Sequence, residues 1–246
     1  MPVATSSPDS HTTRFGCFAN RVDFESMSAQ AIMEWANCRF DNELAITTSF
    51  GIQSAVMLHM SSRIRPNIPV VWVDTGFLPK ETYWYAEQLT DLLGLNLHVY
   101  QADLSPARME TLYGRLWESD RVEDLNEYDR IRKVEPLQKA FRDLQPTGWI
   151  SGLRSEQTNF RSQLERVWHD GERTRIHPIL NWSQKDTYGY MQRYDLPQHP
   201  LWHDGYTSVG DEHSSRALSS SDGHDRATRF NGLKEECGIH TTLTAN

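Results

Sequence analysis

The chain has 246 residues, of which 38% are hydrophobic and 24% are charged, and its formal net charge at pH 7 is −8. This length is enough for one large α/β domain with appendages. The negative charge disfavours nonspecific nucleic-acid binding, which usually needs a basic face. No apolar run approaches the roughly 20 residues that cross a bilayer, and the start lacks a basic region followed by an apolar segment. These features predict a cytoplasmic protein that binds neither nucleic acid nor membranes.

The order of predicted elements alternates strands with helices. Predicted strands, the first of them ending in a polar turn, lie at 44–51, 68–73, 97–100, 149–152 and 175–179. Predicted helices lie at 26–38, 52–60, 79–93, 105–129, 137–144 and 183–194. Strands that alternate with helices of this length indicate βαβ units and a parallel sheet.

This pattern divides the chain into three predicted parts. Residues 1–40 form an N-terminal segment, disordered over 1–20 and then helical, and residues 41–204 form a nucleotide-binding α/β domain. Residues 205–246 combine five glycines with a serine-rich stretch, a composition that buries little apolar area. We therefore predict a flexible C-terminal tail.

Polar residues collect where the predicted strands end, which is where open parallel sheets bind ligands. The loop 47–54 places hydroxyl and backbone N–H groups at a helix N-terminus, where they would attract an anion. It is not a Walker A loop, because it lacks the second glycine and the Lys-Ser/Thr pair. Asp74 could accept from a nucleoside, or could merely cap the turn at Gly76. Arg154 and Arg161 could bind an anion, or could pair with nearby glutamates on the surface.

Cys237 lies ten residues from the end of the chain, in the run Glu-Cys-Gly-Ile-His, and has no second cysteine near it. The other two cysteines, Cys17 and Cys38, are far away in the sequence, which argues against a disulfide framework. Cysteine attacks as the thiolate, and Lys234 or His240 could supply the cation that stabilises it. Cys237 is therefore a candidate nucleophile, with an incidental surface thiol as the alternative.

Seven motifs occur together, in the order seen in phosphoadenylyl-sulfate reductases. They are Ser-Phe-Gly-Ile-Gln-Ser at 49–54, Asp-Thr-Gly at 74–76, Lys-Val-Glu-Pro at 133–136, Gly-Leu-Arg at 152–154, His-Pro-Leu-Trp at 199–202, Ser-Val-Gly-Asp at 208–211 and Glu-Cys-Gly-Ile-His at 236–240. The chain thus resembles this family from about residue 42 to residue 240. The resemblance implies an adenine nucleotide α-hydrolase-like fold and a homodimer. It also implies reduction of 3′-phosphoadenylyl sulfate to sulfite, with thioredoxin or glutaredoxin as the electron donor.

The resemblance also implies roles for individual residues. Cys237 would be the nucleophile, and the tail would close over the sulfate. The implied substrate-binding residues are Ser49, Phe50, Gly51, Gln53, Ser54, Asp74, Thr75, Gly76, Lys133, Gly152, Leu153, Arg154, Gln157, Arg161, Arg226, Arg229 and His240. In the implied mechanism the thiolate attacks the sulfate sulfur, the nucleoside bisphosphate leaves, and an S-sulfonated cysteine remains for a dithiol to reduce.

The sequence departs from a related group, the adenylyl-sulfate reductases, at four positions. That group holds an iron–sulfur cluster with cysteines just before the Lys-Val-Glu-Pro motif and after Ser-Val-Gly. The corresponding residues here are Tyr128, Asp129, Asp211 and Ser214. None of them can replace a cluster thiolate, so we expect no iron–sulfur cluster and no metal.

Two other functions fit parts of the sequence. An ATP-pyrophosphatase or adenylyltransferase-like enzyme would share the fold, but its loop needs a glycine and an aspartate where this chain has Phe50 and Gln53. A noncatalytic nucleotide-binding regulatory protein would have no need of the cysteine motif near the end of the chain.

Overall fold

The computed structural model describes residues 22–219, 222, 225–234 and 236–240. The predicted disorder of residues 1–20 and the position of Cys17 lie outside this range. Within it, a six-stranded sheet has the order β3-β2-β1-β4-β6-β5. The strands are β1 (Leu44–Thr48), β2 (Pro69–Val73), β3 (Asn96–Tyr100), β4 (Gly148–Ile150), β5 (Val167–His169) and β6 (Thr174–Ile176).

Five strands are parallel, and β5 alone runs antiparallel, against β6. The predicted parallel sheet with flanking helices is therefore confirmed. The helices are α1 (Ala29–Phe40), α2 (Ser54–Ile64), α3 (Lys80–Leu93), α4 (Pro106–Tyr113), α5 (Val122–Asp129), α6 (Glu135–Leu144) and α7 (Gln184–Arg193). A π-helical turn, η3 (Arg130–Val134), joins α5 to α6.

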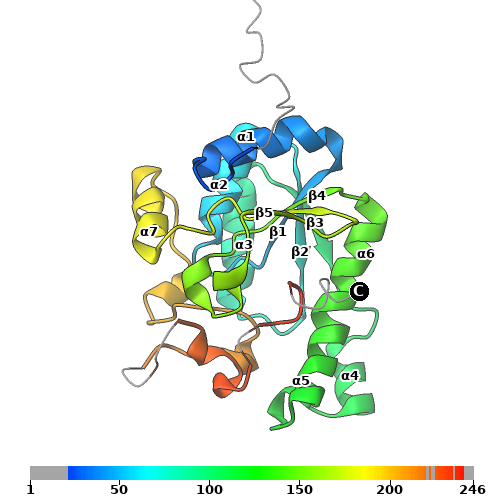
Figure 1. Cartoon of the computed structure of the whole chain (residues 1–246). Coiled ribbons are helices and arrows are strands. Elements are labelled where there is room, and N and C mark those ends of the chain that lie inside the picture. Colours follow the sequence, from blue (N-terminus) through cyan, green and yellow to red (C-terminus); the bar gives the residue numbers. More distant parts are fainter. Residues whose placement is uncertain (1–21, 220–221, 223–224, 235, 241–246) are drawn as a thin grey trace, which may run out of the picture.

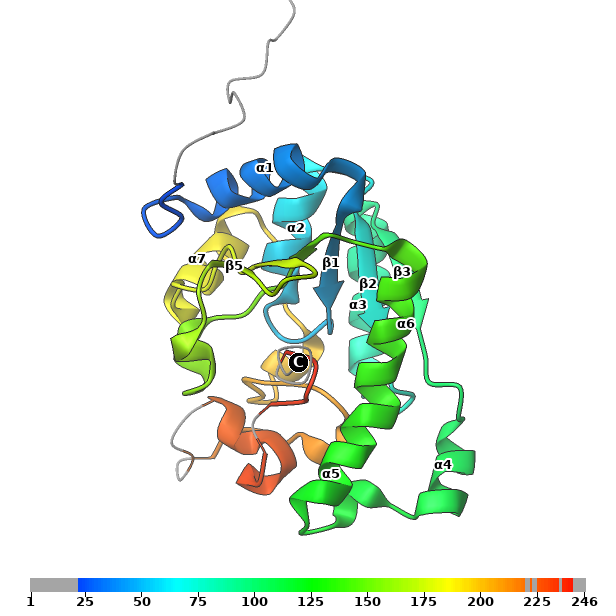
Figure 2. The ribbon, with the colours of Figure 1, turned by 45° about the vertical axis from the view of Figure 1, so that its right-hand side comes forward.

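Two layers of helices cover the sheet (Figures 1 and 2). On one face α1, α2, α3 and α7 enclose the main core, whose centre includes Ile46, Leu58 and Val70, each at most 1% exposed. On the other face α6 packs through Leu137 and Phe141 on Trp149 of β4. Helices α4 and α5 extend beyond the carboxyl ends of the strands (Figure 2).

Local sequence explains where several elements begin and end. Ser28 caps α1 by accepting from the backbone N–H of Ala31, and Ser183 with Asp186 forms the predicted capping box of α7. The predicted helix 105–129 is two helices, because α4 ends at Gly114, whose φ of 73° is left-handed. The predicted strand 175–179 ends at Ile176, two residues before Pro178.

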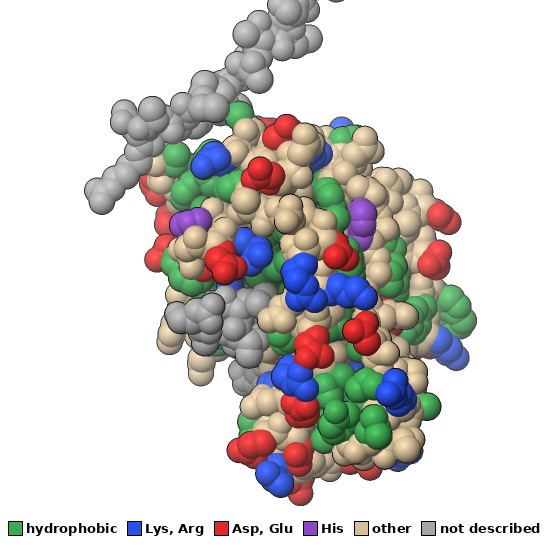
Figure 3. Space-filling view, turned by 90° about the vertical axis from the view of Figure 1, so that its right-hand side faces the viewer, with side chains coloured by type: hydrophobic (Ala, Val, Ile, Leu, Met, Phe, Trp, Pro, Cys, Tyr) green, Lys and Arg blue, Asp and Glu red, His purple; other side chains and the backbone are tan. Residues whose placement is uncertain are grey.

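Short 3₁₀ segments occupy much of the connecting chain, and they include η6 (Pro200–Trp202), η7 (Glu212–Ser214) and η8 (Asp225–Gly232). The described parts of the chain that follow η6 lie below the carboxyl ends of β1 and β2 (Figure 1). In the described part of the chain, no helix is both long enough and apolar enough to traverse a bilayer. Acidic and basic side chains alternate on the face formed by α6 and α5, and its described atoms show no continuous basic surface (Figure 3).

Candidate active site

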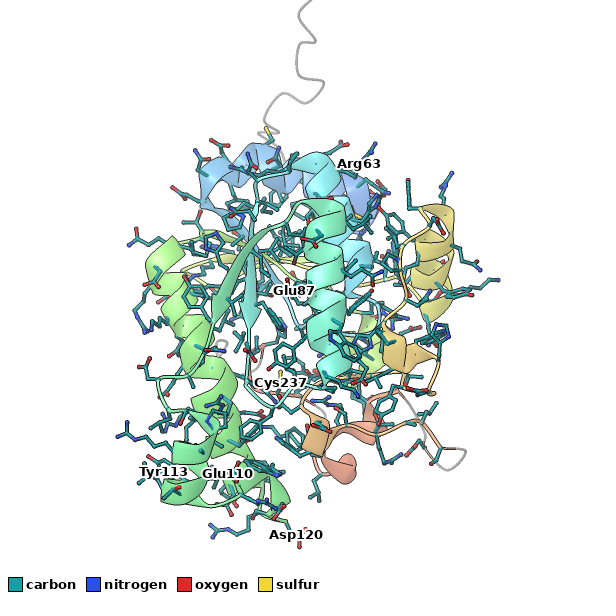
Figure 4. All side chains as sticks on the ribbon, turned by 180° about the vertical axis from the view of Figure 1, so that it is seen from behind. Arg63, Glu87, Glu110, Tyr113, Asp120 and Cys237 are labelled. Carbon is teal, nitrogen blue, oxygen red and sulfur yellow. The ribbon has the colours of Figure 1, made fainter. Side chains whose placement is uncertain are left out.

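A cavity of about 250 Å³ lies at the carboxyl ends of the parallel strands. The strand order reverses direction between β1 and β4, and ligands of open α/β sheets bind at such a switch point. Fifteen of the eighteen residues predicted for the site line this cavity; Phe50, Asp74 and Gly76 do not. Cys237 lies just beyond the carboxyl ends of the strands, at the end of the sheet opposite α1 (Figure 4).

The loop between β1 and α2 forms one wall of the cavity through Ser49, Gly51, Gln53 and Ser54. Phe50 turns away from it. Its ring is fully buried and packs edge-on against Trp72 with ring centroids 4.9 Å apart, and its φ of 47° gives the loop its sharp bend. Phe50 therefore shapes the loop from the core, while its neighbours face the ligand space.

In the Asp-Thr-Gly turn after β2, too, one residue lines the cavity and the others do not: Thr75 faces it, and Asp74 and Gly76 shape the turn. Asp74 accepts from the backbone N–H of Gly76 (2.8 Å), from the Tyr83 hydroxyl (2.7 Å) and from the Gln101 amide (2.6 Å). These contacts agree with the capping role that the sequence left open. A Cβ on Gly76 would lie 2.8 Å from Pro106, so close packing and a φ of 74° both favour glycine. Thr75 lines the cavity and donates its hydroxyl proton to Asp211.

Lys133 lies on the π-helical turn between two buried carboxylates. Its Nζ is 2.8 Å from Asp129 Oδ1 and 2.8 Å from Asp211 Oδ2. Burial lowers the pKa of Lys133, but the two carboxylates raise it by more, so the pKa lies above its ordinary value. Lys234 of the tail also reaches Asp129, at 2.5 Å. The lysines and aspartates form an ionic network that joins the tail to the α5–α6 connection.

This network occupies the region where the sequence comparison placed the cluster cysteines of adenylyl-sulfate reductases. Asp129 and Asp211 bind Lys133, and Ser214 lies 3.4 Å from a guanidinium nitrogen of Arg229. Tyr128 is buried, and its hydroxyl lies 3.0 Å from His213 Nε2. The donors are oxygens, which do not suit an iron–sulfur cluster. Among the described residues, no group of three or more His, Cys, Asp or Glu side chains is placed to hold a metal ion.

Four arginines line the cavity, namely Arg154, Arg161, Arg226 and Arg229. Arg161 binds Glu236 through two hydrogen bonds of 2.8 Å each, and Arg154 pairs with Glu156. Burial and the neighbouring charge of Arg161 lower the pKa of Arg226 to about 10, which still leaves it charged at neutral pH. With Lys133, these side chains place five cations at the cavity, and three of them, Lys133, Arg154 and Arg161, are paired with carboxylates.

Arg229 packs directly against the backbone of the Ser-Val-Gly-Asp motif. Its guanidinium would lie within about 2.5 Å of a Cβ at Gly210, so only glycine leaves room for it. The Nη1 atom donates to Ser215 Oγ at 2.6 Å. Arg229 is thus held by the tail itself, with its charge beside the cavity.

The cations close to Cys237 differ from those that the sequence suggested. Lys133 and Arg226 lie near enough for their charges to interact with the Cys237 thiol. Lys234 instead pairs with Asp129. Burial, together with the charge of Arg161, lowers the pKa of His240 well below its ordinary range, so its ring is neutral at pH 7. Of the two cations that the sequence suggested, Lys234 is thus paired with Asp129 and His240 is a neutral ring, whereas Lys133 and Arg226 interact with Cys237 through their charges.

Sequence reasoning missed two further members of the site. Asp211 ends the Ser-Val-Gly-Asp motif, which assigns it no partner; its carboxylate is 1% exposed and holds both Thr75 and Lys133. Glu236 begins the Glu-Cys-Gly-Ile-His motif, which likewise assigns it no partner; it binds Arg161 and accepts from the Thr158 hydroxyl at 2.8 Å. The sequence carries no local signal for the partners of Asp211 or Glu236. It does carry one for the pairing of Asp129 with Lys133, because opposite charges four residues apart on a helix lie close together.

A parallel sheet with a polar loop and a helix N-terminus at its switch point defines the class of protein as adenine nucleotide α-hydrolase-like. A solved structure of phosphoadenylyl-sulfate (PAPS) reductase from Candida auris, a phosphate complex, superposes with a TM-score of 0.68 at 29% identity, covering 79% of this chain and 93% of that chain. FMN adenylyltransferase from Candida glabrata, in complex with ATP, shares the fold with a TM-score of 0.54 at 15% identity, covering 79% and 66%.

The sequence narrows this class to one family. The model of the phosphoadenosine phosphosulfate reductase domain matches residues 43–217. A phosphoadenosine 5′-phosphosulfate reductase from Synechococcus sp. is 54% identical over 213 residues, which cover 87% of this chain and 92% of the relative. The protein of the same name from Synechocystis sp. is 52% identical, covering 96% and 95%. The chain belongs to the phosphoadenosine phosphosulfate reductase family.

Proposed function

We propose that this protein reduces 3′-phosphoadenylyl sulfate to sulfite and adenosine 3′,5′-bisphosphate, with Cys237 as the nucleophile. The observation that carries the proposal is that Cys237 lines the cavity at the carboxyl ends of the strands together with Lys133 and Arg226, whose charges interact with its thiol. Membership of the family, whose relatives carry the reductase name, supports the substrate.

In the first half-reaction the Cys237 thiolate attacks the sulfur of the sulfuryl group. A new S–S bond forms, the bond between that sulfur and the bridging phosphate oxygen breaks, and the bond's electron pair leaves on the nucleoside bisphosphate. Negative charge grows on the leaving phosphate and remains on the sulfuryl oxygens. Fixed cations such as Arg161, Arg226 and Lys133 stabilise charge that develops in a site shielded from water.

In the second half-reaction a dithiol protein reduces the enzyme. One thiolate of thioredoxin or glutaredoxin attacks the Sγ atom of the S-sulfonated Cys237, and sulfite leaves with the electron pair of the S–S bond. The second thiol of the donor then attacks the mixed disulfide, which releases the Cys237 thiolate and oxidises the donor to its disulfide. The donor must reach Cys237, so the proposal includes an opening of the tail between the two steps.

The test uses the purified protein with 3′-phosphoadenylyl sulfate and reduced thioredoxin, and measures sulfite and nucleoside bisphosphate. With the reductant we expect the two products in equal amounts; without it we expect at most one equivalent of the nucleoside bisphosphate and no sulfite. A parallel incubation with ATP and magnesium measures pyrophosphate. Pyrophosphate release without sulfite would replace this proposal with the adenylyltransferase-like alternative, and nucleotide binding with neither product would indicate a noncatalytic protein.

A further inference from the structure

The peptide that carries Cys237 is held on both sides of the cysteine. On the N-terminal side, Glu236 binds Arg161 through two hydrogen bonds of 2.8 Å and also accepts from Thr158. On the C-terminal side, the His240 ring stacks on Trp149, with centroids 5.1 Å apart and planes 11° apart. Ile239 also packs against the cluster that contains Trp149, so Cys237 lies between an ionic contact and contacts to the sheet.

An arginine outside the cavity makes a second contact on the C-terminal side. Arg175 of β6 donates from Nη1 to the backbone oxygen of His240 at 3.1 Å. It is 3% exposed, and its guanidinium carbon lies 5.2 Å from the ring centroid of Trp149 and 5.4 Å from that of Trp168. Arg175 is not among the residues that line the cavity.

Arg175 is itself fixed by the turn between β5 and β6. Its Nε donates to Asp170 Oδ2 at 2.9 Å. The other oxygen of Asp170 accepts from the backbone N–H groups of Arg173 (2.7 Å) and Glu172 (3.0 Å), which closes the turn. The donor that reaches His240 is therefore part of a rigid hairpin, paired to the sheet through β6.

Gly238 makes an anchor at this place necessary. Its φ is 79°, and glycine has more backbone freedom than any other residue, so the position of the Cys237 sulfur depends on how firmly the peptide is held on both sides of it. Holding the His240 carbonyl fixes the far side of this flexible position. The His240 ring is neutral because burial lowers its pKa, so the backbone carbonyl, and not a ring charge, meets the arginine.

We propose that Arg175 is a positioning residue that, by holding the His240 carbonyl, keeps Cys237 in place over the cavity for attack on the bound sulfuryl group. This inference rests on the proposed function for its kinetic part only. A displacement of about 1 Å in the reacting atoms can reduce a rate by roughly 100-fold. We expect loss of the anchor to slow S-sulfonation of Cys237 by about 10- to 100-fold, with little change in nucleotide affinity.

The test compares Arg175→Lys with Arg173→Lys. Lysine keeps the charge but cannot bind Asp170 and the His240 carbonyl together as the guanidinium does. Arg173 lies in the same hairpin, pairs with the exposed Glu172 at 3.0 Å, and has its guanidinium carbon 4.9 Å from the ring centroid of Phe141. Lysine can keep both the ion pair and the cation–π contact, so Arg173→Lys is the matched control. Four quantities are measured for each variant: the melting temperature, the dissociation constant of adenosine 3′,5′-bisphosphate, the single-turnover rate of S-sulfonation, and the rate at which iodoacetamide alkylates the Cys237 peptide.

In Arg175→Lys we expect faster alkylation by roughly 10-fold, slower S-sulfonation, and a dissociation constant within about threefold of wild type. Arg173→Lys should match wild type in all four. Wild-type alkylation and S-sulfonation rates in folded Arg175→Lys would overturn the proposal. If Arg175→Lys does not fold, Asp170→Asn, which weakens the fixation of the same guanidinium, takes its place with the same expected directions and the same contradicting result.

The two arms of the experiment separate this inference from the proposed function. Alkylation of Cys237 needs no substrate turnover, so it reports on the anchor even if wild-type protein forms no sulfite. Faster alkylation in Arg175→Lys without any wild-type S-sulfonation would support the anchor and contradict the proposed reaction. Normal S-sulfonation in wild type, together with unchanged alkylation and S-sulfonation rates in Arg175→Lys, would support the proposed reaction and contradict the anchor.

Discussion

Lys133 and Asp211 form a buried ion pair, 2.8 Å between Nζ and Oδ2, that joins the tail to the π-helical turn between α5 and α6. Both side chains are at most 8% exposed. The Thr75 hydroxyl binds the same carboxylate, so three segments distant in sequence meet at Asp211. The pair therefore places a cation of the cavity and fixes the segment that leads into the tail.

The first prediction concerns this pair. Asp211→Asn should lower the free energy of unfolding by roughly 2–4 kcal/mol, because removing one partner leaves a buried charge poorly compensated. The expected loss lies toward the lower end because Asp129 still binds Lys133, at 2.8 Å. Urea unfolding measures the change. The control is Asp204→Asn, an exposed aspartate in the same region. Equal stabilities of the two variants would contradict the role given to Asp211.

The second prediction is a pH dependence of stability that originates in His177. This histidine is buried, its Nδ1 lies 2.8 Å from Ser151 Oγ, and burial, with the charges of Arg175 and Arg161, lowers its pKa from 6.5 to about 3. Below pH 6.5 His177 binds a proton in the unfolded chain but stays neutral in the native state. The free energy of unfolding therefore decreases as the pH falls from 6.5 toward 3.

Between pH 6 and pH 5 this one group should remove about 1 kcal/mol of stability. His177→Gln, which can still bind Ser151, should therefore lose less stability than wild type over the same interval. Urea unfolding at both pH values gives the comparison. Parallel pH profiles for the two proteins would show that His177 is not neutral in the native state.

A third prediction concerns movement of the tail, which was expected from composition. In the structure the tail is packed closed: Val209, Asp211, Thr228 and Arg229 are all buried. Between these buried positions, the Arg216 side chain is 42% exposed. We expect trypsin to cleave after Arg216, and adenosine 3′,5′-bisphosphate to slow the cleavage by binding the tail arginines. Equal cleavage rates with and without saturating nucleotide would argue against closure of the tail on the ligand.

A fourth prediction is that the purified protein is colourless and contains no iron. Tyr128, Asp129, Asp211 and Ser214 offer oxygen donors, and both aspartates are held by lysines. Metal analysis and a visible absorption spectrum test this directly. Stoichiometric iron with broad visible absorbance would mean that cysteines outside these positions hold a cluster.

The sequence predicted the inner strands from short apolar or β-branched runs, the clearest of which is β2. Val70, Val71 and Trp72 illustrate this, since all three are buried in β2. Strand β5 escaped detection because its three residues are partly or fully exposed and are held chiefly by pairing with β6. The position of the cavity followed from the ends of the strands, where a parallel sheet collects its loops.

What the sequence could not provide was the direction in which each loop residue faces and which distant groups pair. Phe50 and Asp74 belong to motifs at the cavity, but one enters the core and the other caps its own turn. Glu236 and Arg161 are 75 positions apart, and no local pattern indicates that they meet.

The homodimer, the thioredoxin or glutaredoxin donor and the cytoplasmic location remain predictions.

The central claim is that Cys237 carries the sulfuryl group during the reaction, and a single-turnover experiment tests it most directly. Protein is mixed with 3′-phosphoadenylyl sulfate without reductant, and the peptides are analysed by mass spectrometry. We predict one added SO₃ group, on Cys237 alone, formed at the rate at which adenosine 3′,5′-bisphosphate appears and released as sulfite when thioredoxin is added. Cys237→Ser should bind the nucleotide within a few-fold of wild type and form neither adduct nor sulfite. Sulfite formation by Cys237→Ser, or an adduct on Cys38 instead, would contradict the account.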